Sequence, residues 1–185
     1  MKRMLSMLAL TALPAAALAS PTVEMITSKG NIEIALDSAK APKTVENFVA
    51  YAKAGHYNGT VFHRVIDGFM IQGGGFDTKL SQKPTRAAIA NEASNGLKNG
   101  IGTIAMARTA DPNSATAQFF INVANNDFLD YKSPTPQGAG YAVFGKVIKG
   151  MDVVNRIAKT RTGSMNGMGD VPFEPIVIQK VTIKP

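Results

Sequence analysis

The most unusual chemistry of the chain lies between Val61 and Phe76, which reads VFHRVIDGFMIQGGGF. Strand periodicity would place Phe62, Arg64 and Ile66 on one face, so a permanently charged guanidinium stands among apolar side chains. Burying an unpaired cation is costly, and such an arginine therefore has an assigned partner or faces a groove. The glycines at 73–75 should then break the strand, where the backbone closely approaches another chain or a ligand. This stretch is our candidate site.

Other kinds of chemistry have little material here. The 185 residues include no Cys, which excludes disulfides, thiol nucleophiles and thiolate metal sites. His56 and His63 are the two histidines, too few for a convincing zinc site, and we expect no metal and no cofactor. The glycine run matches neither a phosphate-binding loop nor a dinucleotide fingerprint. A net charge of +7 without a tight Lys/Arg cluster does not indicate a nucleic-acid partner.

Short β-prone runs dominate the chain and must position the candidate site. The first two flank Lys29-Gly30, which predicts a hairpin, and in the second Ile32, Ile34 and Leu36 alternate with polar or small residues. Segments rich in Gly, Asn, Pro and Ser separate the runs, which span 23–28, 31–36, 60–66, 69–73, 102–107, 118–123, 142–147 and 176–183.

Two helices are predicted beside these strands. One begins at Pro42 and stops near Gly55, with apolar residues at helical spacing between them, and the other spans about 151–159. Since strands dominate without regular βαβ alternation, the pattern favours an antiparallel barrel or sandwich whose open ends the helices cover. The turn-rich segments 133–140 and 162–172 should be surface loops, with Met165 and Met168 as flexible surface. No internal repeat or linker divides the chain.

The N-terminus has the features of an export signal. Lys2 and Arg3 precede an apolar run, and Ala17-Leu18-Ala19 fits the small-x-small pattern of a signal peptidase site. We therefore expect a signal peptide at 1–19, cleavage before Ser20, and a single domain at 20–185. Pro14 and the alanines make the run too short and weak for a membrane anchor. Cleavage would lower the formal charge from +7 to +5, because it removes two cations and no acid.

Five blocks, in order along the chain, resemble the cyclophilin-type peptidyl-prolyl isomerases. The first is Phe62-His63-Arg64-Val65-Ile66 followed by Phe69-Met70-Ile71-Gln72-Gly73-Gly74. The other four are GTIAMA at 102–107, QFFI at 118–121, FLD at 128–130 and VFGKV at 143–147. The likeness covers about 23–183, and one block could arise by chance where five in sequence could not. It is closest in character to the exported, periplasmic bacterial branch, so we expect a periplasmic location.

The resemblance implies a mainly β fold, a closed eight-stranded antiparallel barrel capped by two α-helices, with the site in a groove on its outer wall. It also implies catalysis by Arg64 and a proline pocket of Phe69, Met70, Phe120 and Leu129. Gln72 would bind substrate backbone and steady Arg64, and the backbone of Ala107 and Arg108 would pair with the substrate chain. The remaining expected contacts are His63 and Tyr141 at the rim, and Phe128.

The implied reaction is rotation about the peptide bond before proline in unfolded or folding exported proteins. Rotation breaks the amide resonance, so the enzyme needs a group that favours the pyramidal nitrogen but no nucleophile or metal. The main alternative is a non-catalytic proline-peptide-binding module or holdase on the same fold, and a more distant one is a hollow barrel that carries a small ligand. We expect a monomer with proline-containing clients and, after cleavage, no membrane attachment.

The chain departs from the familiar family pattern at several positions, among them Tyr141, where His is common, and Gly75, where Asp is common. Phe128 stands where many eukaryotic relatives have a Trp whose indole N–H binds cyclosporin, so we expect weak cyclosporin binding. Arg108-Thr109 replaces the smaller Asn-Ala often found there, which leaves the contacts to the substrate chain open.

Overall fold

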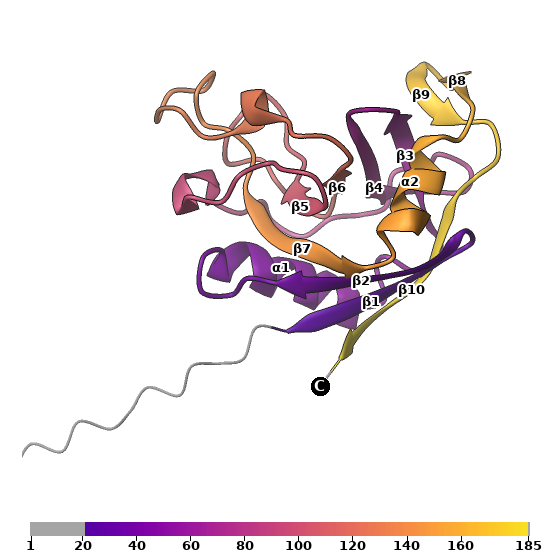
Figure 1. Cartoon of the computed structure of the whole chain (residues 1–185), viewed down its shortest axis with the longest axis horizontal. Helices are drawn as coiled ribbons and strands as arrows, with labels where there is room; N and C mark the ends of the chain where they lie inside the picture. Colours follow the sequence, from indigo (N-terminus) through magenta and orange to yellow (C-terminus); the bar gives the residue numbers. More distant parts are fainter. Residues whose placement is uncertain (1–20, 185) are drawn as a thin grey trace, which may run out of the picture.

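Eight strands close an antiparallel barrel (Figure 1). The computed structural model describes residues 21–184, so the predicted signal peptide at 1–19 lies outside the described residues. Around the barrel the neighbour order is β1-β10-β3-β4-β6-β5-β7-β2, which confirms the predicted closure and strand number. The strands are β1 (Thr22–Thr27), β2 (Gly30–Leu36), β3 (Thr60–Ile66), β4 (Met70–Asp77), β5 (Thr103–Met106), β6 (Phe119–Asn122), β7 (Val143–Lys149) and β10 (Val177–Lys184).

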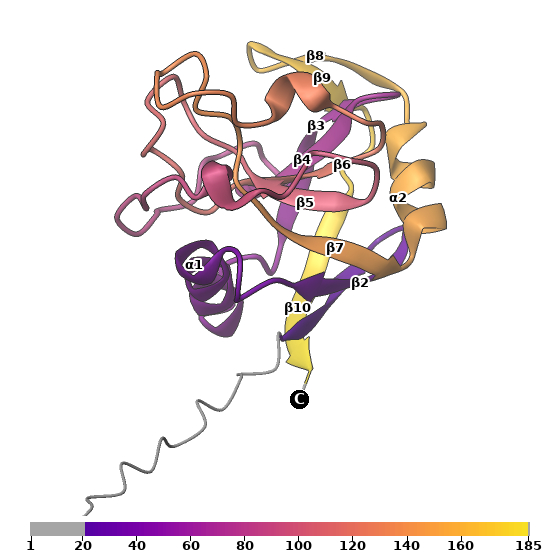
Figure 2. The ribbon, with the colours of Figure 1, turned by 60° about the vertical axis from the view of Figure 1, so that its left-hand side comes forward.

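Two helices pack against the barrel from opposite sides (Figures 1 and 2). Helix α1 (Pro42–Lys53) begins with a proline whose fixed φ suits a first helical turn, and α2 is Met151–Ala158. Their apolar faces join the same buried cluster as the inward side chains of the strands; Phe48 of α1 meets Phe119 of β6 edge-on at 5.7 Å. The interior is therefore filled by side chains, and this packing removes the ligand-carrying barrel as an alternative.

A β-bulge in β3 determines which way Arg64 faces. Phe62 pairs with Gly73 and Arg64 with Gln72, so β3 advances by two residues where β4 advances by one. As a result Phe62 and Val65 both belong to the interior cluster, while Arg64 is exposed on the outside. The prediction that Phe62 and Arg64 share a face was wrong, because simple alternation does not hold across a bulge.

The sequence suggested that the glycines at 73–75 break their strand, but they lie inside β4. Thr60 pairs with Asp77 and Phe62 with Gly73, so an advance of two positions along β3 corresponds to four positions along β4. The extra residues of β4 form a bulge at the glycines. Gly74 has φ +86°, and a Cβ there would stand 2.8 Å from the Phe119 ring. The close approach that requires glycine is therefore to the protein's own core and not to a ligand.

A small hairpin replaces one predicted loop. Strands β8 (Thr162–Met165) and β9 (Met168–Pro172) pair antiparallel, and the two residues between them, Asn166 and Gly167, have φ of 52° and 79°. Positive φ at both positions suits an Asn-Gly hairpin turn, so the prediction of a loop at 162–172 was wrong, although most of the segment does lie at the surface. Strand β9 packs against β3 at the upper edge of the view in Figure 1.

Two short 3₁₀ helices complete the described elements, Ala93–Asn95 and Asp127–Leu129, and the second lies beside the groove described below. Within residues 21–184, no helix has both the length and the apolar character needed to cross a membrane.

Candidate active site

A groove of about 290 Å³ is hollowed into the outer wall of the barrel. It lies across β3, β4 and β6 and is completed by the segments that follow β5 and precede β7. Every residue that lines it was a predicted site residue, although the sequence alone could not show that they share one cavity. They are Arg64, Phe69, Met70, Gln72, Ala107, Arg108, Phe120, Leu129 and Tyr141.

The floor of the groove is a second apolar cluster, separate from the barrel core. Met70 and Phe120 are only 2% and 4% exposed, and they pack with Ala105 and Val143 on the outside of the sheet. Phe69, Leu129 and other partly buried side chains surround this floor. The outward set of alternating strand residues is thus apolar here, which forms a slot suited to a flat hydrophobic ring.

Arg64 stands at one side of this slot with a partner that the sequence analysis missed. Its Nε lies 3.7 Å from Oδ2 of Asp170 in β9, and the two side chains are 45% and 47% exposed. The contact of the pair is on the Nε side of the guanidinium, and the Arg64 side chain donates no hydrogen bond within the described residues. The Asn166-Gly167 turn signal could have revealed the hairpin, but not its contact with β3, which is distant in sequence.

Gln72 lies opposite Arg64 in the sheet but is bonded elsewhere. Its Nε2 donates to Oε1 of Gln118 at 3.0 Å, a residue directly before β6 that was not predicted as part of the site. The expectation that Gln72 steadies Arg64 is therefore replaced by an amide pair with Gln118. This pair fixes the Gln72 side chain along the groove wall.

Ala107 and Arg108 form the opposite side of the groove. The Ala107 N–H donates to the Gln118 carbonyl at 3.0 Å, whereas the Ala107 carbonyl and the Arg108 N–H have no hydrogen-bond partner among residues 21–184. The Arg108 carbonyl has no partner there either, so of the four backbone groups of these two residues one is occupied and three are available to a substrate chain. The Arg108 guanidinium lies 4.5 Å from the centroid of the Tyr141 ring, and Tyr141 in turn meets Phe120 edge-on.

A buried network of asparagines supports the groove from behind. Nδ2 of Asn126 donates to the Phe69 carbonyl at 2.9 Å and to Oδ1 of Asn122 at 2.7 Å. Asn99 receives a hydrogen bond from Asn122 and bonds Asp130. These side chains tie together the separate segments that carry Phe69, Leu129 and Tyr141, and buried polar groups satisfied in this way rigidify a site.

Phe128 lies outside the groove lining. The residue is 63% exposed, and its ring stacks on that of Phe69 with 5.6 Å between the ring centroids. It therefore extends the apolar wall at the mouth of the groove without forming its floor.

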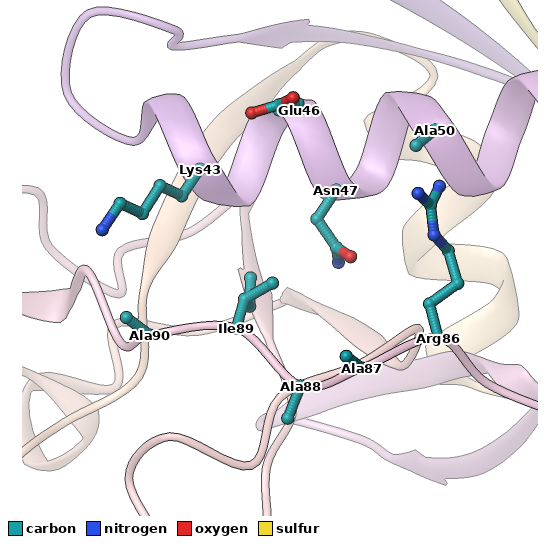
Figure 3. Close-up of a pocket in the computed structure, with 9 residues that line it drawn as sticks. All are labelled: Lys43, Glu46, Asn47, Ala50, Arg86, Ala87, Ala88, Ile89 and Ala90. Carbon is teal, nitrogen blue, oxygen red and sulfur yellow. The ribbon is translucent and has the colours of Figure 1, made fainter.

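A second hollow, of about 400 Å³, lies between α1 and the segment 86–90 (Figure 3). Asn47 points from α1 into this gap, but its Nδ2 already donates to the Thr116 carbonyl at 2.7 Å. Lys43, Glu46, Arg86 and several alanines make up most of the lining, which includes no aromatic ring. It offers nothing comparable to the slot beside Arg64.

Among residues 21–184 no group of three or more His, Cys, Asp or Glu side chains could hold a metal ion.

Comparison with known proteins agrees with this arrangement. The model of the family described as cyclophilin type peptidyl-prolyl cis-trans isomerase/CLD matches residues 22–183. The chain belongs to the cyclophilin family. A peptidyl-prolyl cis-trans isomerase of Streptomyces antibioticus is 60% identical over 162 residues, covering 88% of this chain and 98% of that protein. Peptidyl-prolyl cis-trans isomerase B of Escherichia coli is 55% identical over 157 residues, covering 85% and 96%.

Solved cyclophilin structures share the fold. One from Cryptosporidium parvum superposes with a TM-score of 0.72 at 27% identity, covering 90% of this chain and 98% of that one. A second structure of that protein, obtained in the presence of the dipeptide Ala-Pro, gives a TM-score of 0.71 at 28% identity, covering 89% and 99%. The protein is thus a peptidyl-prolyl cis-trans isomerase, as the sequence predicted.

His63, predicted at the rim of the groove, is buried in this cyclophilin and does not line the groove. It is 6% exposed, its ring lies 4.6 Å from that of Phe76, and its Nδ1 has no hydrogen-bond partner among the described residues. Burial lowers the pKa of His63 to about 4; the Val61 backbone opposes this shift, and the charge of Arg64 adds to it. The imidazole is therefore neutral at pH 7 and serves packing, not proton transfer.

This burial predicts a pH-dependent stability. Between pH 6.5 and 4 the unfolded chain takes up a proton at His63 that the folded protein resists, so the free energy of unfolding falls as the pH falls. The His63 contribution to that loss should be about 3 kcal/mol. Urea unfolding across this range should show a shallower pH dependence for His63→Gln than for wild type. His56→Gln is the comparison: burial lowers the pKa of His56 as well, so this variant should flatten the pH dependence too, but less than His63→Gln. Equal slopes for wild type and His63→Gln would contradict the assignment.

Proposed function

We propose that Arg64 is the catalytic residue of this cyclophilin and that Phe69, Met70, Phe120 and Leu129 hold the proline ring of the client. One observation carries the proposal: the bulge in β3 presents a guanidinium, which donates no hydrogen bond within residues 21–184, beside an apolar slot on the same wall. Gln72, Ala107, Arg108 and Tyr141 line the same groove and would contact the client chain on either side of its proline.

The chemistry follows from the electronic structure of the peptide bond. In the planar ground state the prolyl nitrogen shares its lone pair with the carbonyl, and twisting the bond returns that pair to a pyramidal nitrogen. A guanidinium N–H aimed at this nitrogen gains a hydrogen bond in the twisted state that the planar state cannot offer. Such a difference between the transition state and the ground state is what raises the rate.

The energies are within reach of these groups. The uncatalysed barrier is about 18–20 kcal/mol, and a ten-thousandfold acceleration requires the removal of roughly 5.5 kcal/mol. A well-placed charged donor could supply about half of this, and fixation of the ring in the slot could supply the remainder. Asp170 at the Nε side would keep the guanidinium oriented. Because the pair is exposed to solvent, the carboxylate would offset only part of the positive charge of Arg64.

Arg64→Ala should lower kcat/KM for a proline peptide about a hundredfold while the protein stays folded, because the charged donor supplies about half of the stabilisation. A protease-coupled or NMR exchange assay would measure the rate, and circular dichroism the fold. Arg156→Ala is the matched control, since Arg156 is an exposed arginine of α2 paired with Asp152. An Arg64→Ala enzyme as fast as wild type would refute the role. Wild-type rates no better than buffer would favour the non-catalytic binder or holdase.

We also propose that the mature enzyme is a periplasmic monomer that acts on exported clients. The support is the sequence of residues 1–19, in which two cations are followed by an apolar run and then by small residues, an order typical of a signal peptide. Native mass spectrometry of the protein recovered from a periplasmic extract should give the mass of a single chain that begins at Ser20. A mass that includes residues 1–19, or a dimer at micromolar concentration, would count against export with cleavage or against the monomer.

Weak cyclosporin binding is the last element of the proposal. Phe128 places an exposed ring at the mouth of the groove, but phenylalanine has no N–H to donate. Phe128→Trp should therefore tighten cyclosporin inhibition of the isomerase, by several-fold or more for one added hydrogen bond. A titration of both proteins tests this, and tight inhibition of the wild type would overturn the expectation.

A further inference from the structure

The groove has an uncompensated positive charge at one side. Of the nine lining residues two are arginines and none is acidic. Arg64 has Asp170 at 3.7 Å, so part of its charge is balanced within the protein. Arg108, by contrast, has no carboxylate within 4.0 Å among residues 21–184.

The Arg108 side chain is nevertheless held in place. Its Nε donates to the Gly140 carbonyl and its Nη1 to the Thr109 carbonyl, both at 2.9 Å, and its guanidinium stacks over Tyr141. The remaining terminal nitrogen, Nη2, has no hydrogen-bond partner in the described part of the chain. A fixed guanidinium has already lost most of its rotamer entropy, so a ligand that binds it need not supply that cost.

We propose that Arg108 makes this cyclophilin favour clients with an acidic side chain close to the proline, on the flank of the proline that lies against Arg108. A carboxylate is the group that a partly buried, unpaired guanidinium recognises best, through a charge-assisted hydrogen bond. The preference should be confined to one flank, because Asp170 offsets the other arginine of the groove. This inference rests on the proposed function, since it assumes that the client occupies the groove.

The test uses short acetylated and amidated peptides, so that the ends bear no charge. The peptides differ only in having Glu, Gln or Lys at one of the three positions before or after the proline. For the wild type we expect kcat/KM for Glu to exceed that for Gln about fivefold at one or two adjacent positions of one flank, with Lys below Gln. The Glu-to-Gln ratio should decrease toward one as the salt concentration is raised to about 1 M.

Variants tie the preference to Arg108. Arg108→Gln should bring the Glu-to-Gln ratio close to one, and Arg108→Lys should keep part of it, because a charge remains without the stacked geometry. Arg161→Gln is the matched control: Arg161 also lies over an aromatic ring, Phe173, at 5.9 Å, but outside the groove, so its loss should leave the ratio unchanged.

A ratio of one at every position in the wild type, with the Gln peptides isomerised normally, would overturn this inference and leave the proposed function intact. A ratio that persists in Arg108→Gln would overturn it as well. If instead no peptide of the series were isomerised faster than in buffer, the proposed function itself would be contradicted.

Discussion

The site depends on one extra residue in β3. Side chains of a regular strand alternate between the two faces, and a barrel interior has no place for a charged guanidinium without a partner. The bulge lets Phe62 and Val65 both face the core and places the Arg64 side chain on the outer wall. Deleting one residue here would turn the side chains on one side of the bulge to the opposite face of the sheet. Either the packing of the core or the lining of the groove would then be lost. The position of the cation is thus fixed by backbone register before any side-chain contact is made.

Several distant segments then converge on that position. Strands β4 and β6 supply the apolar floor, the segments around 107 and 141 supply the far wall, and β9 supplies the carboxylate beside Arg64. The buried asparagines connect the turn after β3 with the segments after β6, so these walls are held by hydrogen bonds as well as by packing. Preorganisation of this kind suits a reaction in which the enzyme must hold one half of a bond while the other half turns.

Much of this architecture could be predicted from the sequence, and the failures share a cause. The β3 bounds, both helices and the residues that line the groove follow from local patterns and from the family blocks, because these features depend on neighbouring residues or on motifs. The bulge at His63-Arg64, the glycines within β4, the burial of His63 and the contact of Asp170 with Arg64 were missed. Each of these depends on the register or packing of segments distant in sequence, which a period of two or a turn signal cannot reveal.

The part of the chain that the structure describes has two buried apolar clusters with different tasks: one fills the barrel and one forms the floor of the groove. The larger cluster accounts for most of the buried side chains and hence for most of the hydrophobic contribution to folding. Substitutions in the smaller one can therefore reshape recognition while the barrel keeps most of its packing. Such a division allows descendants of one ancestral barrel to diversify their clientele during evolution, since a new preference need not begin with a loss of thermodynamic stability.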